Sequence, residues 1–216
     1  MSDLLTLWRG ALPALLDGLG TGLAVTGLSL LVGLPLGLCL ALGATGRQPW
    51  PRRACRLLAA LGRGTPVLIL LDGAKAGLTG PSPSYAPSLA AVLALGWWTA
   101  AQGSAILAAA LAAVPRGQWE AAGAIGLGRR DTLRFVLLPQ GLRLAAPALL
   151  GLAVLLLQAT SLGLAVGLPD LLARALDFGG ATSRVVPVLA LAAMLYAAAG
   201  LPAWLLAAAL ERRATR

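Results

Sequence analysis

Five apolar segments constrain the fold of this chain more than any other feature. They cover residues 19–42, 57–78, 87–114, 145–166 and 185–210. Each is close to or longer than the roughly 20 residues that a helix needs to cross hydrocarbon at 1.5 Å per residue. Only a helix satisfies its own backbone there without closing a barrel, and these Ala- and Leu-rich runs lack the alternation of barrel strands. The sequence predicts an all-α polytopic membrane protein with about five transmembrane helices, forming one domain over residues 1–216.

Composition supports a lipid-facing surface and excludes several chemistries. Hydrophobic residues make up 58% of the chain and charged residues only 12%, whereas soluble domains carry about 25% charged residues. The absence of histidine excludes Ser-His-Asp catalysis and histidine metal sites. Cys39 and Cys55 form neither a metal-ligand spacing nor a disulfide framework. There is no G-x-x-x-x-G-K-[ST] phosphate loop, so we expect no ATP hydrolysis by this chain. Taken with the absence of histidine and of a cysteine framework, this leads us to expect no catalytic residue, no metal and no bound cofactor.

The distribution of arginine predicts the orientation. Thirteen of the 17 basic residues follow the first and third segments or lie in the C-terminal tail. The positive-inside rule makes that side cytoplasmic, which places the N-terminus outside and the C-terminus in the cytoplasm. Arginines between apolar runs are typical of a membrane protein, so the net charge of +9 does not indicate a nucleic-acid partner. Residues 1–16 lack a cleavage site and are expected to form a short interfacial helix at the outer surface.

The longest polar interruption is the predicted cytoplasmic loop at about residues 114–143. It contains the string EAAGAIGLGRRDTLRFVLLP, from Glu120 to Pro139. Residues 119–125 can form a short helix, followed by a sharp turn in which Gly126 and Gly128 supply positive φ. A second amphipathic stretch at 132–138 then leads to Pro139, which is tolerated in the first turn of a helix. Such a helix–turn–helix between two spans can dock into a groove on a partner and move both spans.

The spacing within this loop resembles a known family motif. Glu120-Ala121-Ala122, then Gly126, Val136 and Leu138-Pro139, match the EAA loop of ABC-importer permeases, with Val in place of the usual Ile. Further elements, in the family's order, are VPRGQWEAA at 114–122, RGTP at 63–66, TSL at 160–162, GLPDL at 167–171 and LERR at 210–213. The chain therefore resembles the inner-membrane permease subunits of the polar amino-acid family, of the histidine, glutamine and arginine type.

This resemblance implies a division of labour between subunits. Permeases of the family form a dimeric pore with a second copy or a related permease, in the bacterial inner membrane. Two cytoplasmic ATPase subunits use ATP, and an extracytoplasmic binding protein delivers the solute. The residues implied in coupling to the ATPase are Glu120, Ala121, Ala122 and Gly126, with Leu138 and Pro139 fixing the return into the fourth span. The alternative for Glu120 is that it only makes the loop soluble.

Polar residues within the apolar segments are candidates for the translocation path: Asp72, Lys75, Gln102, Ser104, Gln158, Thr160 and Ser161. Asp72 and Lys75 share a helix face at i, i+3. They either bind the ammonium and carboxylate of a substrate or form a self-neutralised pair at the outer interface, and we favour the second role. The others either line the path or form hydrogen bonds between helices. Pro35, Pro66 and Pro147 are expected to kink their spans.

The sequence departs from the family pattern along the path. Ala105 and Ala108 stand where the family usually has Glu and Arg, and Gln158-Ala159 replace a usual Lys-Asp pair. One interpretation is that this chain is the degenerate half of a heterodimer whose partner permease binds the solute. A different class of function, an ion-coupled carrier or channel using Asp72 and Lys75, needs no ATPase and gives the EAA loop no role.

Overall fold

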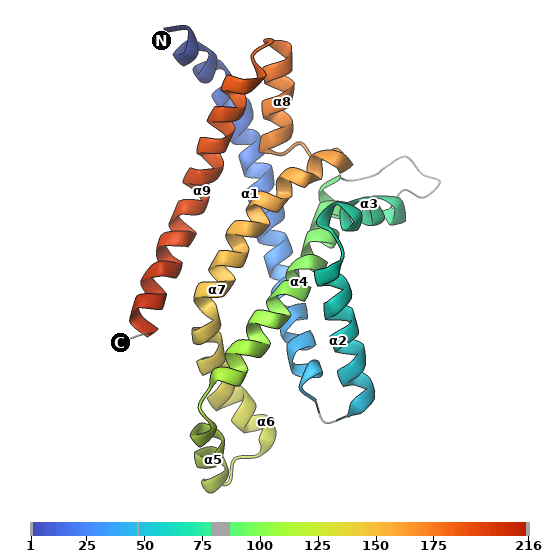
Figure 1. Cartoon of the computed structure of the whole chain (residues 1–216), viewed down its shortest axis with the longest axis vertical. Coiled ribbons are helices and arrows are strands. Elements are labelled where there is room, and N and C mark those ends of the chain that lie inside the picture. The colour runs from blue at the N-terminus through green and yellow to red at the C-terminus, as the bar shows by residue number, and fades with distance from the viewer. Residues whose placement is uncertain (1, 47, 79–86, 215–216) are drawn as a thin grey trace.

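The computed structural model describes residues 2–46, 48–78 and 87–214, and every regular element in these ranges is helical. In chain order the α-helices are α1 (Ser2–Ala44), α2 (Pro49–Gly64), α3 (Val67–Leu78), α4 (Pro87–Ala113), α5 (Arg116–Ala124) and α6 (Arg129–Asp131). A π-helix, η1 (Thr132–Leu137), leads into α7 (Leu138–Ala159). A 3-10 helix, η2 (Thr160–Val166), α8 (Leu171–Ala181) and α9 (Val185–Ala214) follow. Figure 1 shows the long helices side by side along the long axis.

The predicted set of spans is confirmed in outline. Four described stretches are long and apolar enough to cross a membrane: Asp3–Ala44, Pro87–Ala113, Arg129–Val166 and Val185–Arg212. The predicted second span, 57–78, is instead a pair of helices, α2 and α3, bent by 106°. Counting that pair as one broken span gives five. The chain is therefore a polytopic helical membrane protein whose second span is not continuous.

The break between α2 and α3 lies at Thr65-Pro66. Pro66 has no N–H and disfavours a helical conformation at the preceding residue. Thr65 is extended accordingly, with φ −89° and ψ 126°, and both its N–H and its hydroxyl donate to the Leu61 carbonyl, at 3.0 and 2.7 Å. The expected kink at Pro66 is thus a full bend, whereas Pro35 and Pro147 lie inside continuous helices.

The expectation of a separate interfacial helix at residues 1–16 is wrong for the described part of that segment. Residues from Ser2 onward are continuous with the first span in α1. Ala11 and Leu15 are fully buried in a cluster with residues of α8 and α9, and the Trp8 indole N–H donates to the Pro187 carbonyl at 3.0 Å. Burial of this apolar face explains why the N-terminal turns extend the span.

The most extensive helix pair is α1 with α4. Small residues allow the backbones to approach, as is common between membrane helices. A Cβ added to Gly33 would lie 2.6 Å from the Gly96 carbonyl oxygen, and one added to Gly37 would lie 2.9 Å from the Ala100 oxygen. The remaining frame is built by α7 against α4 and α9, and by α8 against α1 and α9.

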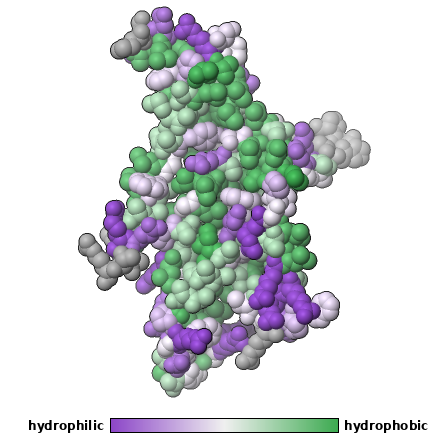
Figure 2. Space-filling view, viewed as in Figure 1, coloured by the Kyte–Doolittle hydropathy of each residue, from purple (hydrophilic) through white to green (hydrophobic). Residues whose placement is uncertain are grey.

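The two ends of the molecule differ in what they carry. The α1–α2 connection, α5 and α6 lie at one end, and the C-terminus of α9 points the same way, whereas the N-terminus and the α8–α9 turn lie at the other end (Figure 1). In Figure 2 hydrophilic residues lie at both ends and also in patches between them, among hydrophobic residues. The basic connections therefore share an end, as the predicted alternation of spans requires, and the assignment of that end to the cytoplasm stays a prediction.

Candidate functional site

The loop between α4 and α7 projects from the end of the helical frame (Figure 1). Pro115, with φ −57° and ψ 137°, separates α4 from α5. The predicted short helix at 119–125 is confirmed as α5, but it begins earlier, at Arg116, and ends at Ala124. Glu120 and Ala121 are exposed, whereas Ala122 is 3% exposed. The first two residues of the EAA motif therefore face outward, and the third packs inward.

The turn after α5 is a Schellman motif around a left-handed glycine. Gly126 has φ +79°, as predicted. The Leu127 N–H donates to the Ala122 carbonyl and the Gly126 N–H to the Gly123 carbonyl, both at 3.0 Å, which is the 6→1 and 5→2 pattern of that motif. The prediction of positive φ at Gly128 is wrong, because Gly128 has φ −65° and ψ 158° and precedes α6 in an extended conformation.

The chain returns to the membrane through a continuous helical rod. The predicted amphipathic stretch at 132–138 is helical, but it forms the start of the spanning helix rather than a separate element. Leu138 and Pro139 are the first residues of α7, so the placement of the proline in a first turn is confirmed. The Leu138 N–H donates to the Leu133 carbonyl, five residues back, in the wide turn of η1. This wide turn precedes a proline that has no N–H to give.

A side-chain hydrogen bond connects α5 to α7, and the backbone at Pro115 connects α5 to α4. The Gln140 amide nitrogen donates to the Gln118 side-chain oxygen of α5 at 3.2 Å and to the Val136 carbonyl at 2.9 Å. On the other side, α7 approaches α4 so closely that a Cβ on Gly141 would lie 2.6 Å from Leu111 Cδ2. The helix α5 is therefore joined to α4 through Pro115 and to α7 through the Gln118–Gln140 hydrogen bond.

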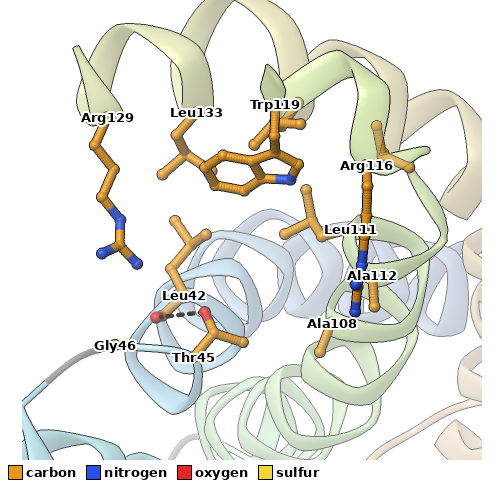
Figure 3. A pocket seen from close by; sticks show the side chains of 12 residues that line it. Leu42, Thr45, Gly46, Ala108, Leu111, Ala112, Arg116, Trp119, Arg129 and Leu133 are labelled. Carbon is orange, nitrogen blue, oxygen red and sulfur yellow. Dashed lines mark hydrogen bonds between the residues drawn. The ribbon is translucent and has the colours of Figure 1, made fainter. Parts of the chain in front are cut away.

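A pocket of about 570 Å³ lies between this loop and the ends of two long helices (Figure 3). Its walls come from the end of α1, the last turns of α4, α5 and the α6–η1 segment. Trp119 and Leu133 close one side of it, and Arg116 and Arg129 stand at its two flanks. Sequence reasoning did not identify this pocket, because its lining comes from two stretches far apart in the chain, residues 42–46 and 108–137.

The candidate path residues do not all meet at one place in this chain. Gln102 is half-buried and lines a groove of about 490 Å³ between α4 and α7, together with Trp98 and Leu152. Ser104 is 4% exposed, donates to the Ala101 carbonyl at 2.7 Å and lines a smaller pocket of about 190 Å³ between α1, α2 and α4. The two residues thus face different sides of α4, and their role in a path stays a prediction.

The TSL element forms the 3-10 turn that ends the α7 rod. Thr160 is fully buried, donates to the Leu157 carbonyl at 2.8 Å and lies beside Gly22 of α1. Ser161 donates to the Gln158 carbonyl at 2.7 Å, and the Gln158 side chain is exposed. Thr160 is therefore packed between α7 and α1, and its role in a path stays a prediction.

Asp72 and Lys75 both lie on α3, beyond the bend. Asp72 is exposed and Lys75 is half-buried. The bend takes α3 out of the line of α2, so these charges belong to a short helix rather than to the end of a straight span. Whether they contact a substrate or neutralise each other stays a prediction.

A buried carboxylate at the opposite end from the loop was missed by sequence reasoning. Asp170 is fully buried, precedes α8 and accepts from the Ala173 N–H at 3.0 Å and from the Tyr196 hydroxyl at 2.9 Å. Burial raises the pKa of Asp170 above its ordinary value, against the opposing effect of these donors. An aspartate before an apolar run signals an N-cap, whereas nothing in the sequence points to Tyr196.

The described chain is thus a polytopic helical membrane protein with a helical loop that projects between two of its spans. Residues 33–216 match the family described as binding-protein-dependent transport system inner membrane component. The chain belongs to this family, and it is the permease component of such a system.

Known relatives match along most of their length. The histidine/lysine/arginine/ornithine transport system permease HisM of Escherichia coli K12 is 33% identical over 190 residues, covering 82% of this chain and 80% of HisM. The L-cystine permease TcyL of Bacillus subtilis is 32% identical, with 93% and 87% covered. A crystal structure of an amino acid ABC transporter with histidines superposes with a TM-score of 0.87 at 27% identity and covers 98% of both chains.

Proposed function

We propose that this permease serves an ATP-driven importer for a polar amino acid or a similar small solute. Its relatives are named for histidine, lysine, arginine, ornithine and cystine transport, and they match this chain over more than four fifths of its length. The proposed assembly contains a second permease copy or paralogue, a cytoplasmic ATPase dimer that uses ATP, and an extracytoplasmic binding protein, in the bacterial inner membrane.

The observation that carries this proposal is the construction of α5. The helix presents Glu120 and Ala121 outward, is ended by the turn at Gly126, and is held to α7 through Gln118 and Gln140. A short helix of this kind inserts into a groove on a partner. Force from a nucleotide-driven partner then passes to α4 and α7, the two helices that flank the groove lined by Gln102.

Crosslinking tests the docking contact. In a variant without Cys39 and Cys55, Ala121→Cys should form a crosslink with a Walker-motif ATPase when membranes from the native host are treated with a short bifunctional reagent. Ala181→Cys, exposed at the opposite end of the molecule, is the matched control and should not react with the same partner. An equal yield at both positions, or none at position 121 in an actively transporting strain, would contradict the proposal.

Uptake assays separate this proposal from an ion-coupled carrier. Uptake into proteoliposomes of the purified complex should require internal ATP and a loaded binding protein, and it should survive ionophores. Uptake that continues without ATP and stops with an ionophore would instead favour a carrier that uses Asp72 and Lys75.

A separate test addresses whether this chain is the degenerate half of a heterodimer whose partner permease binds the solute. Gln158→Ala and Ser161→Ala change side chains outside the buried core. If the partner permease binds the solute, these variants should leave the order of preferred solutes unchanged. A changed preference would place the solute on this chain.

A further inference from the structure

We propose that the pocket behind α5 binds the anionic headgroup of a membrane phospholipid. This is the pocket of about 570 Å³ between the ends of α1 and α4, α5 and the α6–η1 segment. It lies on the Trp119 side of α5, whereas the proposed docking residue Glu120 does not line it. The proposal concerns a ligand of the permease itself and does not depend on which solute is imported.

The pocket carries two positive charges that the protein does not neutralise. Arg116 and Arg129 come from different elements and extend toward the ends of α4 and α1 on opposite flanks of the pocket (Figure 3). Among the residues that the structure describes, neither guanidinium takes part in an ion pair. The nearest acidic residues along the chain, Glu120 and Asp131, are not part of its lining. The site is therefore complementary to an anion.

The depth of the pocket favours a lipid over a soluble anion. Its lining reaches from Gly46, beyond the end of α1, to Ala108, five residues before the end of α4. At 1.5 Å per residue, Ala108 lies about 8 Å from the end of α4 along the helix axis. Leu42, Leu111 and Leu133 line the same space. A free phosphate needs only the cations, whereas a phospholipid needs cations at the helix ends above an apolar wall, which is the arrangement found.

The two arginines also set the size of the expected preference. A cation near an anionic lipid surface strengthens binding about 5-fold. Two such cations correspond to about 30-fold tighter binding of an anionic than of a zwitterionic lipid. If both lipids compete for one pocket, half of the sites are occupied by the anionic lipid at about 3 mol% of it in a zwitterionic bilayer.

Trp119 provides a reporter within the pocket. The complete transporter would be placed in nanodiscs of phosphatidylcholine with increasing fractions of phosphatidylglycerol, and bromine would be attached to the acyl chains of one lipid at a time. We expect bromine on phosphatidylglycerol to quench part of the tryptophan fluorescence with a midpoint of a few mol%. The same lipid should not produce this component in Trp119→Phe, which identifies its source among the six tryptophans.

Paired charge variants test the role of the pocket arginines. Arg116→Gln with Arg129→Gln should abolish the roughly 30-fold preference and raise the midpoint from about 3 to about 50 mol%, which is equal competition between the lipids. The control, Arg130→Gln with Arg134→Gln, removes the same charge from the same loop at positions outside the pocket lining and should keep the low midpoint.

Three results would overturn the proposal. One is equal quenching by the two brominated lipids in the unaltered protein, which needs no variant to fold. A second is an equal shift in both double variants, which would indicate general attraction to the basic end. The third is loss of the low-midpoint component on adding glycerol phosphate at millimolar concentration, which would assign the pocket to a soluble phosphate ester.

Discussion

Replacing Gly126 by alanine isolates the backbone of the coupling turn. Gly126 has φ +79°, and a Cβ at this position would meet no atom within 4 Å. Any effect of Gly126→Ala therefore comes from backbone conformation and not from a clash. An L-residue in the left-handed region costs about 1–2 kcal/mol, so the ratio of formed to unformed turns should fall by about 5- to 30-fold.

Gly123→Ala is the matched control, three residues earlier. Gly123 lies inside α5, and its Cβ would also meet nothing within 4 Å. Alanine in a helix interior is favoured over glycine by about 0.5–1 kcal/mol. The same chemical change should therefore weaken the turn at position 126 and strengthen the helix at position 123.

Hydrogen exchange measures the turn directly, because the Leu127 N–H is bonded to the Ala122 carbonyl. Exchange of amides at 124–127 should be about 5- to 30-fold faster in Gly126→Ala and no faster in Gly123→Ala. ATP hydrolysis stimulated by the loaded binding protein should fall only in the first variant. Equal exchange in both variants would refute the claim that the left-handed glycine holds α5 in place.

The remaining predictions concern the helical frame. Gly33→Ala should lower the free energy of unfolding by about 1–3 kcal/mol, because its Cβ would lie 2.6 Å from the α4 backbone. Gly27→Ala is the control and should leave stability unchanged, because its Cβ would meet nothing within 4 Å. Equal thermal midpoints of the two variants in one detergent would contradict this prediction. Tyr196→Phe removes a donor to buried Asp170 and should cost about 1–3 kcal/mol. Burial raises the folded-state pKa of the Asp170 carboxyl, so the contribution of this group to stability is complete below the ordinary pKa and is lost as pH rises through the raised value. The Tyr196 hydroxyl stabilises the ionised form of Asp170, so Tyr196→Phe should cost more stability at pH 7 than at pH 4. The reverse order would count against this reasoning. Arg174→Gln breaks the 2.8 Å ion pair with Asp17, whose side chain is 64% exposed against 39% for Arg174. The loss of stability should stay below about 1 kcal/mol and vanish in about 1 M salt. A larger, salt-independent loss would argue against an exposed pair.

Features determined by local chemistry were predictable from the sequence. The spans follow from apolar length, and the turn at Gly126 follows from a glycine placed where a short helix must end. Pro139 was likewise predictable in a first helical turn. Gly128 shows the limit of this reasoning, because a glycine permits positive φ without requiring it. Here the Schellman bonds already reverse the chain at Gly126, so Gly128 is free to take an extended conformation.

The fate of a proline depends on its neighbours. Pro147 and Pro66 each remove one backbone donor. The helix α7 nevertheless continues through Pro147, whereas the second span is broken at Pro66. At Pro66 the preceding residue is a threonine whose hydroxyl and N–H both bond the Leu61 carbonyl, which stabilises an end to α2. A bend of 106° also requires α3 to find a new surface, which it does against α4 and η2. Only the first of these conditions can be read from local sequence.

The candidate path was the least predictable part because its residue types do not specify which surface they face. Gln102 and Ser104 are two residues apart on α4, and this spacing turns them to opposite sides of a helix, one toward α7 and the other toward α1 and α2. A polar side chain in a span can form its hydrogen bond on its own helix, as Ser104 does with the Ala101 carbonyl. A path residue is therefore better recognised by its position on a groove than by polarity alone. By that criterion Gln102, half-buried on the groove between α4 and α7, is the residue whose substitution should change transport before the stability of the fold.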